Sequence, residues 1–371
     1  MRDPLSHFER KDPIEREVFR ELKERFLSEA DEEHLKSFEN FTFALIKPDA
    51  FARGLAPEVL ERLLENGFIV SALRVTEMDP EIIDELYMFV KQRYSDSWWI
   101  MPKVFSQAPV VALVLTHEGG DASSRLRDLI GPTTPEAGRP GNLRYDMKGT
   151  NRALNIIHAA DDPASALREA LVFFEMDEVL DAMLSSENLA YEETELIPEE
   201  PIALSRWGCF NSVKFEALEF LESGRSELQD ALDREAEVVS KDLPLEDERY
   251  ALMDIEAKIS FIASKLLAEL ESEAVRVARM PADVSGKSKL AERLEDSMIA
   301  ARLIELLSDE IKLLNEKGFD RLLLSALTMG LIDSDWSEVV VHSTWAVMPQ
   351  MVSDLRKFNK KVITTLSEWV Q

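Results

Sequence analysis

The sequence contains a single cysteine, Cys209, among 371 residues. A lone cysteine excludes an intramolecular disulfide framework and a metal site built from several cysteines. Long apolar runs are also absent: no stretch approaches the roughly 18 apolar residues that a membrane-spanning helix needs, and the first residues lack the apolar centre of a secretory signal. These absences predict a cytoplasmic protein with no membrane partner.

Positive charge is scarce, because 43 lysines and arginines face 71 aspartates and glutamates, for a formal charge of −28. Such a charge repels polyphosphate backbones at long range, which excludes duplex nucleic acid as a general partner. The deficit is uneven, since residues 125–152 hold six bases and three acids, whereas residues 175–200 hold ten acids and no base. One local surface is therefore predicted to be basic in an acidic protein.

Three short runs have the apolar and β-branched composition of buried strands. They are FTFALIK at 41–47, FIVSALRVTE at 68–77 and APVVALVLTH at 108–117. Amphipathic helical patterns separate them, and one, PEVLERLLENG, ends in a glycine suited to a left-handed helix cap. Strands separated by helices predict an α/β (α+β) fold in which helices cover one layer of sheet.

The second half of the chain lacks strand patterns, apart from the short apolar run VVVH at 339–342, whose conformation stays open. Apolar residues recur at three- and four-residue steps from about 246 to 280, which predicts a long helix ended by Pro281. Further helices are predicted over 289–317, 319–329 and 334–370. The predicted parts of the chain are an N-terminal helical segment (1–40), an α/β domain (41–175), an acidic linker (176–205) and an all-α domain of unknown function (206–371).

Candidate functional residues gather around the basic segment. Lys47 follows the first predicted strand, and His158 lies in the segment LNIIHAADD, after three apolar residues. A histidine in such a position is more often a core residue than a catalyst. The loop GPTTPEAGRPGNLRYD, however, supplies arginines and hydroxyls near glycines, which suit an anionic, oxygen-rich ligand such as a chain of phosphates. A solvated basic loop is the alternative.

Three linked motifs, FTFALIKPDAFARG, GPTTPEAGRPGNLRYD and NIIHAADDPASALREALVFF, together resemble the nucleoside diphosphate kinase family. The similarity covers about residues 41–175. It implies a ferredoxin-like βαββαβ core and a nucleoside diphosphate kinase that passes the γ-phosphoryl of an NTP to an NDP by a ping-pong mechanism through phosphohistidine at His158. It also implies Mg²⁺ bound through the nucleotide phosphates, with no protein metal ligand, and a homo-oligomer.

The resemblance assigns roles to residues at matching positions. Lys47 would neutralise charge on the transferred phosphoryl, Glu169 would orient the imidazole, and Tyr87 occupies the position of an active-site tyrosine. The nucleotide would be bound by Lys47, Arg127, Thr133, Arg144, Asn155 and an aromatic residue, Trp98, with Trp99 as the alternative.

Two alanines, Ala159 and Ala160, follow the histidine where the family usually has glycine and serine. Loss of one hydroxyl near the imidazole predicts a slower enzyme rather than an inactive one. The alternative is a low-activity or inactive nucleotide-sensing scaffold whose helical domain binds a protein partner. Relay of the phosphoryl group from His158 to a protein stays open.

Overall fold

The structure is a computed structural model that describes residues 3–191, 196–222, 224–281 and 285–365. The chain divides into two compact units, the first made of Met1–Gly149 with Ala153–Ala203 and the second of Thr150–Arg152 with Leu204–Gln371. Across the part of the chain that the structure describes, no helix is long and apolar enough to cross a bilayer.

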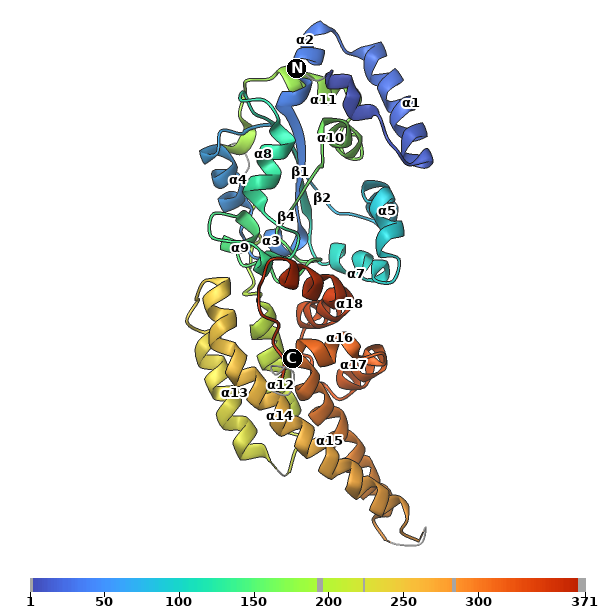
Figure 1. Ribbon diagram of the computed structural model, residues 1–371, viewed down its shortest axis with the longest axis vertical. Coiled ribbons are helices and arrows are strands. Elements are labelled where there is room, and N and C mark those ends of the chain that lie inside the picture. The colour runs from blue at the N-terminus through green and yellow to red at the C-terminus, as the bar shows by residue number, and fades with distance from the viewer. Residues whose placement is uncertain (1–2, 192–195, 223, 282–284, 366–371) are drawn as a thin grey trace. The chain divides into compact units, whose positions relative to one another are not determined.

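A four-stranded antiparallel sheet forms the centre of the first unit (Figure 1). Its strands are β1 (Phe41–Ile46), β2 (Ile69–Thr76), β3 (Val110–Thr116) and β4 (Ile157–Ala159), in the spatial order β2-β3-β1-β4. This order confirms the ferredoxin-like core. The three strands predicted from composition are present, and β4 is the fourth strand that the βαββαβ resemblance implied, although its three residues are too few for a periodic pattern of their own.

Helices cover both faces of this sheet. On one face, α4 (Ala56–Glu65) and α8 (Ala122–Ile130) pack in one apolar core with Ala44 and Ile46 of β1. On the other face, Phe43 stacks on Phe173, which follows α10 (Pro163–Ala170), with ring centroids 5.6 Å apart. Alternate residues of a strand point to opposite faces, and β1 is buried on both sides, so its sequence is apolar apart from the buried Thr42.

The connection between β2 and β3 is a series of short helices and turns that contains two aromatic site candidates, Tyr87 and Trp98. It contains α5 (Pro80–Leu86), α6 (Met88–Lys91), two short 3₁₀ turns (Gln92–Tyr94 and Trp98–Ile100) and α7 (Met101–Phe105). Short helices α3 (Pro48–Ala52) and α9 (Leu143–Asp146), with a 3₁₀ turn at Pro135–Ala137, lie in the loops that follow β1 and α8.

The N-terminal segment forms a separate layer of helices. It comprises the 3₁₀ turns Pro4–Phe8 and Phe38–Asn40 with α1 (Pro13–Glu29) and α2 (Glu32–Ser37) between them. Phe8, Phe26 and Phe38 form a ring cluster with centroid separations of 5.0 to 6.0 Å. Arg10 reaches the carboxylate of Asp162, which caps α10, at 2.9 and 3.0 Å, so this segment holds the helix that carries Glu169.

The segment 176–205, expected as an acidic linker, is largely packed against the sheet instead. It contains α11 (Met176–Leu184) and a 3₁₀ turn at Leu189–Tyr191. The side chains of Val179 and Leu180 are buried, and Asn188 accepts a hydrogen bond from the Val70 amide of β2 at 3.4 Å. The expectation of a solvated linker was wrong for α11, because the apolar residues between its acids form a stripe on one face of the helix.

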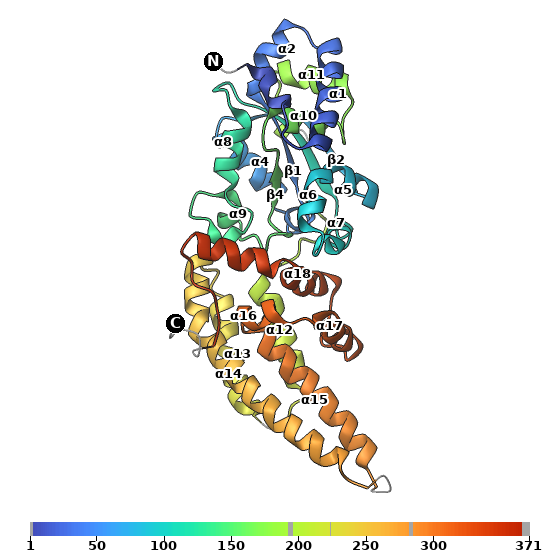
Figure 2. The same ribbon diagram turned by 45° about the vertical axis from the view of Figure 1, so that its right-hand side comes forward.

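The second unit is helical, as predicted (Figure 2). Its helices are α12 (Arg206–Leu218), α13 (Arg225–Val239), α14 (Leu245–Ala278), α15 (Lys287–Leu307), α16 (Glu310–Asn315), α17 (Phe319–Thr328) and α18 (Asp335–Lys357). The long helices α14 and α15 lie side by side. The VVVH run lies inside α18 and is helical, because its valines form part of a buried stripe.

Two predicted helices end earlier than expected. The helix expected over 289–317 is broken after Leu307, since Asp309 accepts hydrogen bonds from the Ile311 and Lys312 amides at 3.0 Å and caps a new helix. The helix expected over 334–370 ends at Lys357, and residues 358–365 are not helical; residues 366–370 of that prediction lie outside the described residues.

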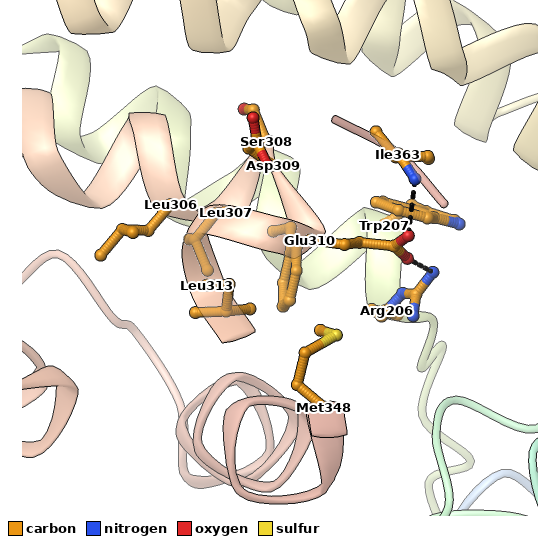
Figure 3. Close-up of a pocket in the computed structure, with 11 residues that line it drawn as sticks. Arg206, Trp207, Leu306, Leu307, Ser308, Asp309, Glu310, Leu313, Met348 and Ile363 are labelled. Atoms are coloured by element: carbon orange, nitrogen blue, oxygen red, sulfur yellow. Dashed lines mark hydrogen bonds and ion pairs between the residues drawn. The ribbon is translucent and has the colours of Figure 1, made fainter. Parts of the chain in front are cut away.

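The segment that follows α18 is held by Glu310. The Glu310 amide donates to the Ile363 carbonyl at 2.8 Å, and the Ile363 amide donates to the Glu310 carboxylate at 2.7 Å. Arg206 and Arg249 also donate to this carboxylate, so a charged group fixes the segment around Ile363 beside a small pocket (Figure 3).

A charged triad lies in the centre of the second unit. Lys214 donates to Glu235 at 2.6 Å and to both carboxylate oxygens of Glu256 at 3.0 and 3.1 Å, and all three side chains are 0% exposed. One cation thus faces two carboxylates without water. Burial, followed by the charge of Glu235, raises the pKa of Glu256 to about 8.

The raised pKa of Glu256 predicts a pH-dependent stability. The unfolded carboxyl ionises near its model value of 4.5, whereas the folded one keeps its proton to about pH 8, so the folded state binds more protons across this window. The free energy of unfolding is therefore expected to fall as pH rises from about 5 to 8. Urea unfolding of the wild type should show this slope, and Glu256→Gln should flatten it. Equal slopes for the two proteins would contradict the assignment.

Candidate active site

His158 lies on β4, opposite Leu45 of the neighbouring strand β1. Its Nε2 atom is 2.7 Å from Oε2 of Glu169, which belongs to α10. The ring of Tyr87 meets the imidazole edge to face, with centroids 5.3 Å apart. An ionised carboxylate only accepts hydrogen bonds, so this contact assigns the hydrogen to Nε2 and leaves the lone pair on Nδ1.

The backbone before His158 adopts an uncommon conformation. Ile156 has a φ of +76°, in the left-handed region that a β-branched residue rarely occupies. Two contacts with the end of β1 hold it, because the Lys47 amide donates to the Ile156 carbonyl at 2.8 Å and Asp49 accepts from the Ile156 amide at 3.0 Å. Asp49 is 0% exposed, and burial raises its pKa while the charge of Lys47 opposes that shift.

Lys47 is a buried lysine beside this turn, with 3% of its surface exposed. Its Nζ donates to the Asn155 side-chain carbonyl at 2.9 Å and to the Ala153 backbone carbonyl. Burial lowers its pKa to about 8, and among the neighbouring charges Asp49 raises this value whereas Arg144 lowers it. A desolvated cation held by neutral oxygens is well placed to gain from an incoming anion.

The phosphate-binding candidates of the long loop are partly engaged with backbone. Arg144 donates to the Ile157 carbonyl at 2.7 and 3.1 Å and to the Gly131 carbonyl at 3.0 Å. Asn155 donates to the Thr133 carbonyl at 3.0 Å, while Thr133 itself is exposed. Arg144 therefore ties the loop to the residue that precedes His158, a role that its sequence context did not reveal.

The two tryptophans differ in their surroundings. Trp98 lies against Tyr87, with centroids 5.9 Å apart, and its Nε1 donates to Asp84 at 3.0 Å. Trp99 is 42% exposed and donates to the Asp96 carbonyl at 3.0 Å. Trp98 thus continues the aromatic row that begins at His158.

Arg127 is the candidate that the structure places with a carboxylate rather than with the cluster around Lys47. It forms an ion pair with Asp161, and the two side chains are 49% and 74% exposed. Asp161 lies three residues after His158, and Asp49 two residues after Lys47. Their closeness in sequence to the motifs was the available signal for both aspartates, whereas Asp84 had none.

A histidine that contacts a carboxylate, a buried lysine and an arginine-bearing loop together form a set of side chains suited to a phosphotransferase. Comparisons with known proteins agree. The family model described as nucleoside diphosphate kinase matches residues 40–179. The nucleoside diphosphate kinase of Archaeoglobus fulgidus is 34% identical over 152 residues, which are 41% of this chain and 97% of the relative. That of Aquifex aeolicus is 37% identical over 136 residues, 36% of this chain and 92% of the relative.

Among solved structures, an orthorhombic crystal form of the Aquifex aeolicus nucleoside diphosphate kinase is 35% identical, covers 38% of this chain and 97% of that chain, and has a TM-score of 0.35. The chain belongs to the nucleoside diphosphate kinase family. By that membership it is a phosphotransferase, a nucleoside-diphosphate kinase. The family match ends at residue 179, so the second unit lies almost entirely outside it.

Proposed function

We propose that this chain transfers the γ-phosphoryl of an NTP to an NDP by a ping-pong mechanism through His158. Nδ1 attacks the γ-phosphorus, the bond between that phosphorus and the β,γ-bridging oxygen breaks, and the NDP leaves. A terminal β-phosphate oxygen of a second NDP then attacks the phosphohistidine and restores the imidazole. The contact of 2.7 Å between Nε2 and Glu169 is the observation that best supports His158 as the nucleophile, because it leaves the lone pair of Nδ1 for the attack.

The remaining residues fit roles in positioning and charge stabilisation. Lys47 would neutralise charge on the transferred phosphoryl, and Asn155 holds its ammonium group. Arg127 would exchange Asp161 for phosphate oxygens, with Thr133 and Arg144 along the same phosphate chain. Trp98 would stack on the base beside Tyr87, whose hydroxyl stays neutral because burial raises its pKa.

Mg²⁺ is proposed as a partner of the nucleotide. Among the residues that the structure describes, no group of three or more histidine, cysteine or acidic side chains could hold a metal. The site instead offers the cations and amides that bind phosphates. Magnesium keeps several waters and commonly binds through substrate phosphates, so a metal carried by the nucleotide fits this set of side chains and would neutralise part of the phosphate charge.

Incubation with γ-labelled ATP and Mg²⁺ tests the mechanism. The expected result is about one label per chain, stable in base and labile in acid, which peptide mapping locates on His158 and which added GDP removes. A His117→Ala protein is the matched control, because this histidine lies outside the site against Phe68 and should not affect labelling. Nucleotide binding without label would contradict the mechanism and favour a nucleotide sensor.

The depressed pKa of Lys47 predicts an alkaline limit on activity. Nucleotide binding needs the ammonium form, which is lost from the free enzyme as pH rises through about 8. The value of kcat/KM should then fall by about tenfold per pH unit, whereas the limb of kcat should lie at higher pH because bound phosphates keep Lys47 protonated. Lys47→Arg should be less active and lack this limb, since guanidinium stays charged. A flat kcat/KM profile up to pH 10 would contradict the assignment.

The assembly and the partners stay predictions. NTP and NDP are the proposed substrates, a homo-oligomer follows only from the family, and a protein partner of the helical unit is still untested. The molar mass of the purified protein, measured by light scattering, tests the predicted homo-oligomer directly.

A further inference from the structure

Three residues of the loop that precedes His158 belong to the helical unit. These residues, Thr150–Arg152, interrupt the first unit, which resumes at Ala153. The Asn151 amide donates to the hydroxyl oxygens of Ser343 at 2.8 Å and Thr344 at 3.0 Å, both on α18, and all three residues are 0% exposed.

A second contact holds the same loop to the same helix. Arg152 forms an ion pair with Asp354, and the two side chains are 14% and 24% exposed. Ser343 and Asp354 are eleven residues apart, which is about three helical turns, so both project from one face of α18. A buried amide with two acceptors and a half-buried ion pair therefore fix two successive loop residues from one rigid element.

The adjoining residues of the loop hold the lysine of the active site. The Ala153 carbonyl and the Asn155 side chain accept hydrogen bonds from Nζ of Lys47. Ala153 follows Arg152 directly, so one peptide bond joins the residues fixed on α18 to the residues whose oxygens bind Lys47. The chain itself is therefore the route by which the position of Asn151 and Arg152 would affect these oxygens.

We propose that Asn151 and Arg152 are positioning residues through which α18 places the loop that holds Lys47. The helical unit thereby takes part in nucleotide binding without supplying a group that touches the nucleotide. This inference rests on the proposed function, because Lys47 is taken as the group that binds the transferred phosphoryl. It assigns to the region outside the family match a direct effect on KM.

The test uses the full-length chain, with the loop-releasing substitutions confined to α18. Ser343→Ala/Thr344→Val removes both acceptors of Asn151, and Asp354→Asn removes the charge that faces Arg152. Asp354→Glu keeps that charge and is the rescue variant. Asp320→Asn is the matched control, because it weakens another polar contact of α18, that of His342 with Asp320 at 2.9 Å, without touching the loop.

Both loop-releasing variants should raise the KM for ATP by about three- to tenfold, with a smaller change in kcat. A loosened loop hydrates Lys47, so the alkaline limb of kcat/KM should move to higher pH, a shift that general destabilisation would not cause. Asp49 and Arg144, the charged groups that face Lys47, are unchanged in every variant. Asp354→Glu and Asp320→Asn should match the wild type.

The outcomes separate this inference from the proposed function. If the wild type forms phosphohistidine but both variants keep its KM and its pH profile, the inference is wrong and the mechanism stands. If the wild type forms none, the mechanism is wrong, and the pH dependence of ADP binding still tests the loop: an unshifted limb in both variants overturns the inference. If the double variant does not fold, the KM and pH profile of Asp354→Asn, which changes the more exposed contact, decide whether the inference holds.

Discussion

His158→Ala is expected to lower kcat for transfer from ATP to GDP by about 10⁴-fold or more, because it removes the nucleophile itself. The fold should be unaffected, since the His158 side chain is one-fifth exposed and its main contact is Glu169. A coupled assay of GTP formation measures the decrease in kcat, and an unchanged thermal unfolding temperature would show that the variant is folded.

Glu169→Gln is expected to lower kcat as well, but by less than His158→Ala. The amide keeps the size of the side chain but loses the charge that stabilises the imidazole as it accepts the phosphoryl group, so a loss of about 10- to 100-fold is expected. Activity of His158→Ala above about one hundredth of the wild type would contradict the mechanism, because deletion of a true nucleophile costs far more than that. The order of the two losses is therefore as informative as their size.

Lys214→Met is expected to lower the free energy of unfolding of the helical unit by about 3–5 kcal/mol. Glu235 and Glu256 would then face each other without a cation in a site with 0% exposure. Urea unfolding followed by far-ultraviolet circular dichroism measures the change. At least one carboxylate must stay protonated in such a site, so the loss should grow with rising pH.

The matched control replaces all three charged groups by neutral ones. In Lys214→Met/Glu235→Gln/Glu256→Gln no buried charge is left, and stability should recover most of what the single substitution loses. If the single and triple variants are equally unstable, the loss comes from packing rather than from unpaired charge. The triad then contributes shape and not electrostatics.

The β-strands of the first unit illustrate what could be predicted locally. β1 and β3 are buried on both faces, so their sequences are apolar apart from one threonine each, whereas β4 has three residues and no pattern of its own. In the second unit, helix existence was predictable but helix ends were not. The cap at Asp309 is a local signal, since its partners are the Ile311 and Lys312 amides, whereas the segment beyond Lys357 is held by a partner distant in sequence, through the contact of Ile363 with Glu310.

Sequence alone established the family resemblance and the order of the candidate residues, and it predicted His158 as the nucleophile, because short motifs such as IKPD and NIIH carry these signals locally. Tertiary structure decided which atoms meet: Nε2 of His158 with Glu169, and Arg127 with Asp161. It also decided that Asn151 is held by α18, nearly two hundred residues further along the chain. Such contacts depend on how separate elements pack, and no local periodicity or motif encodes them.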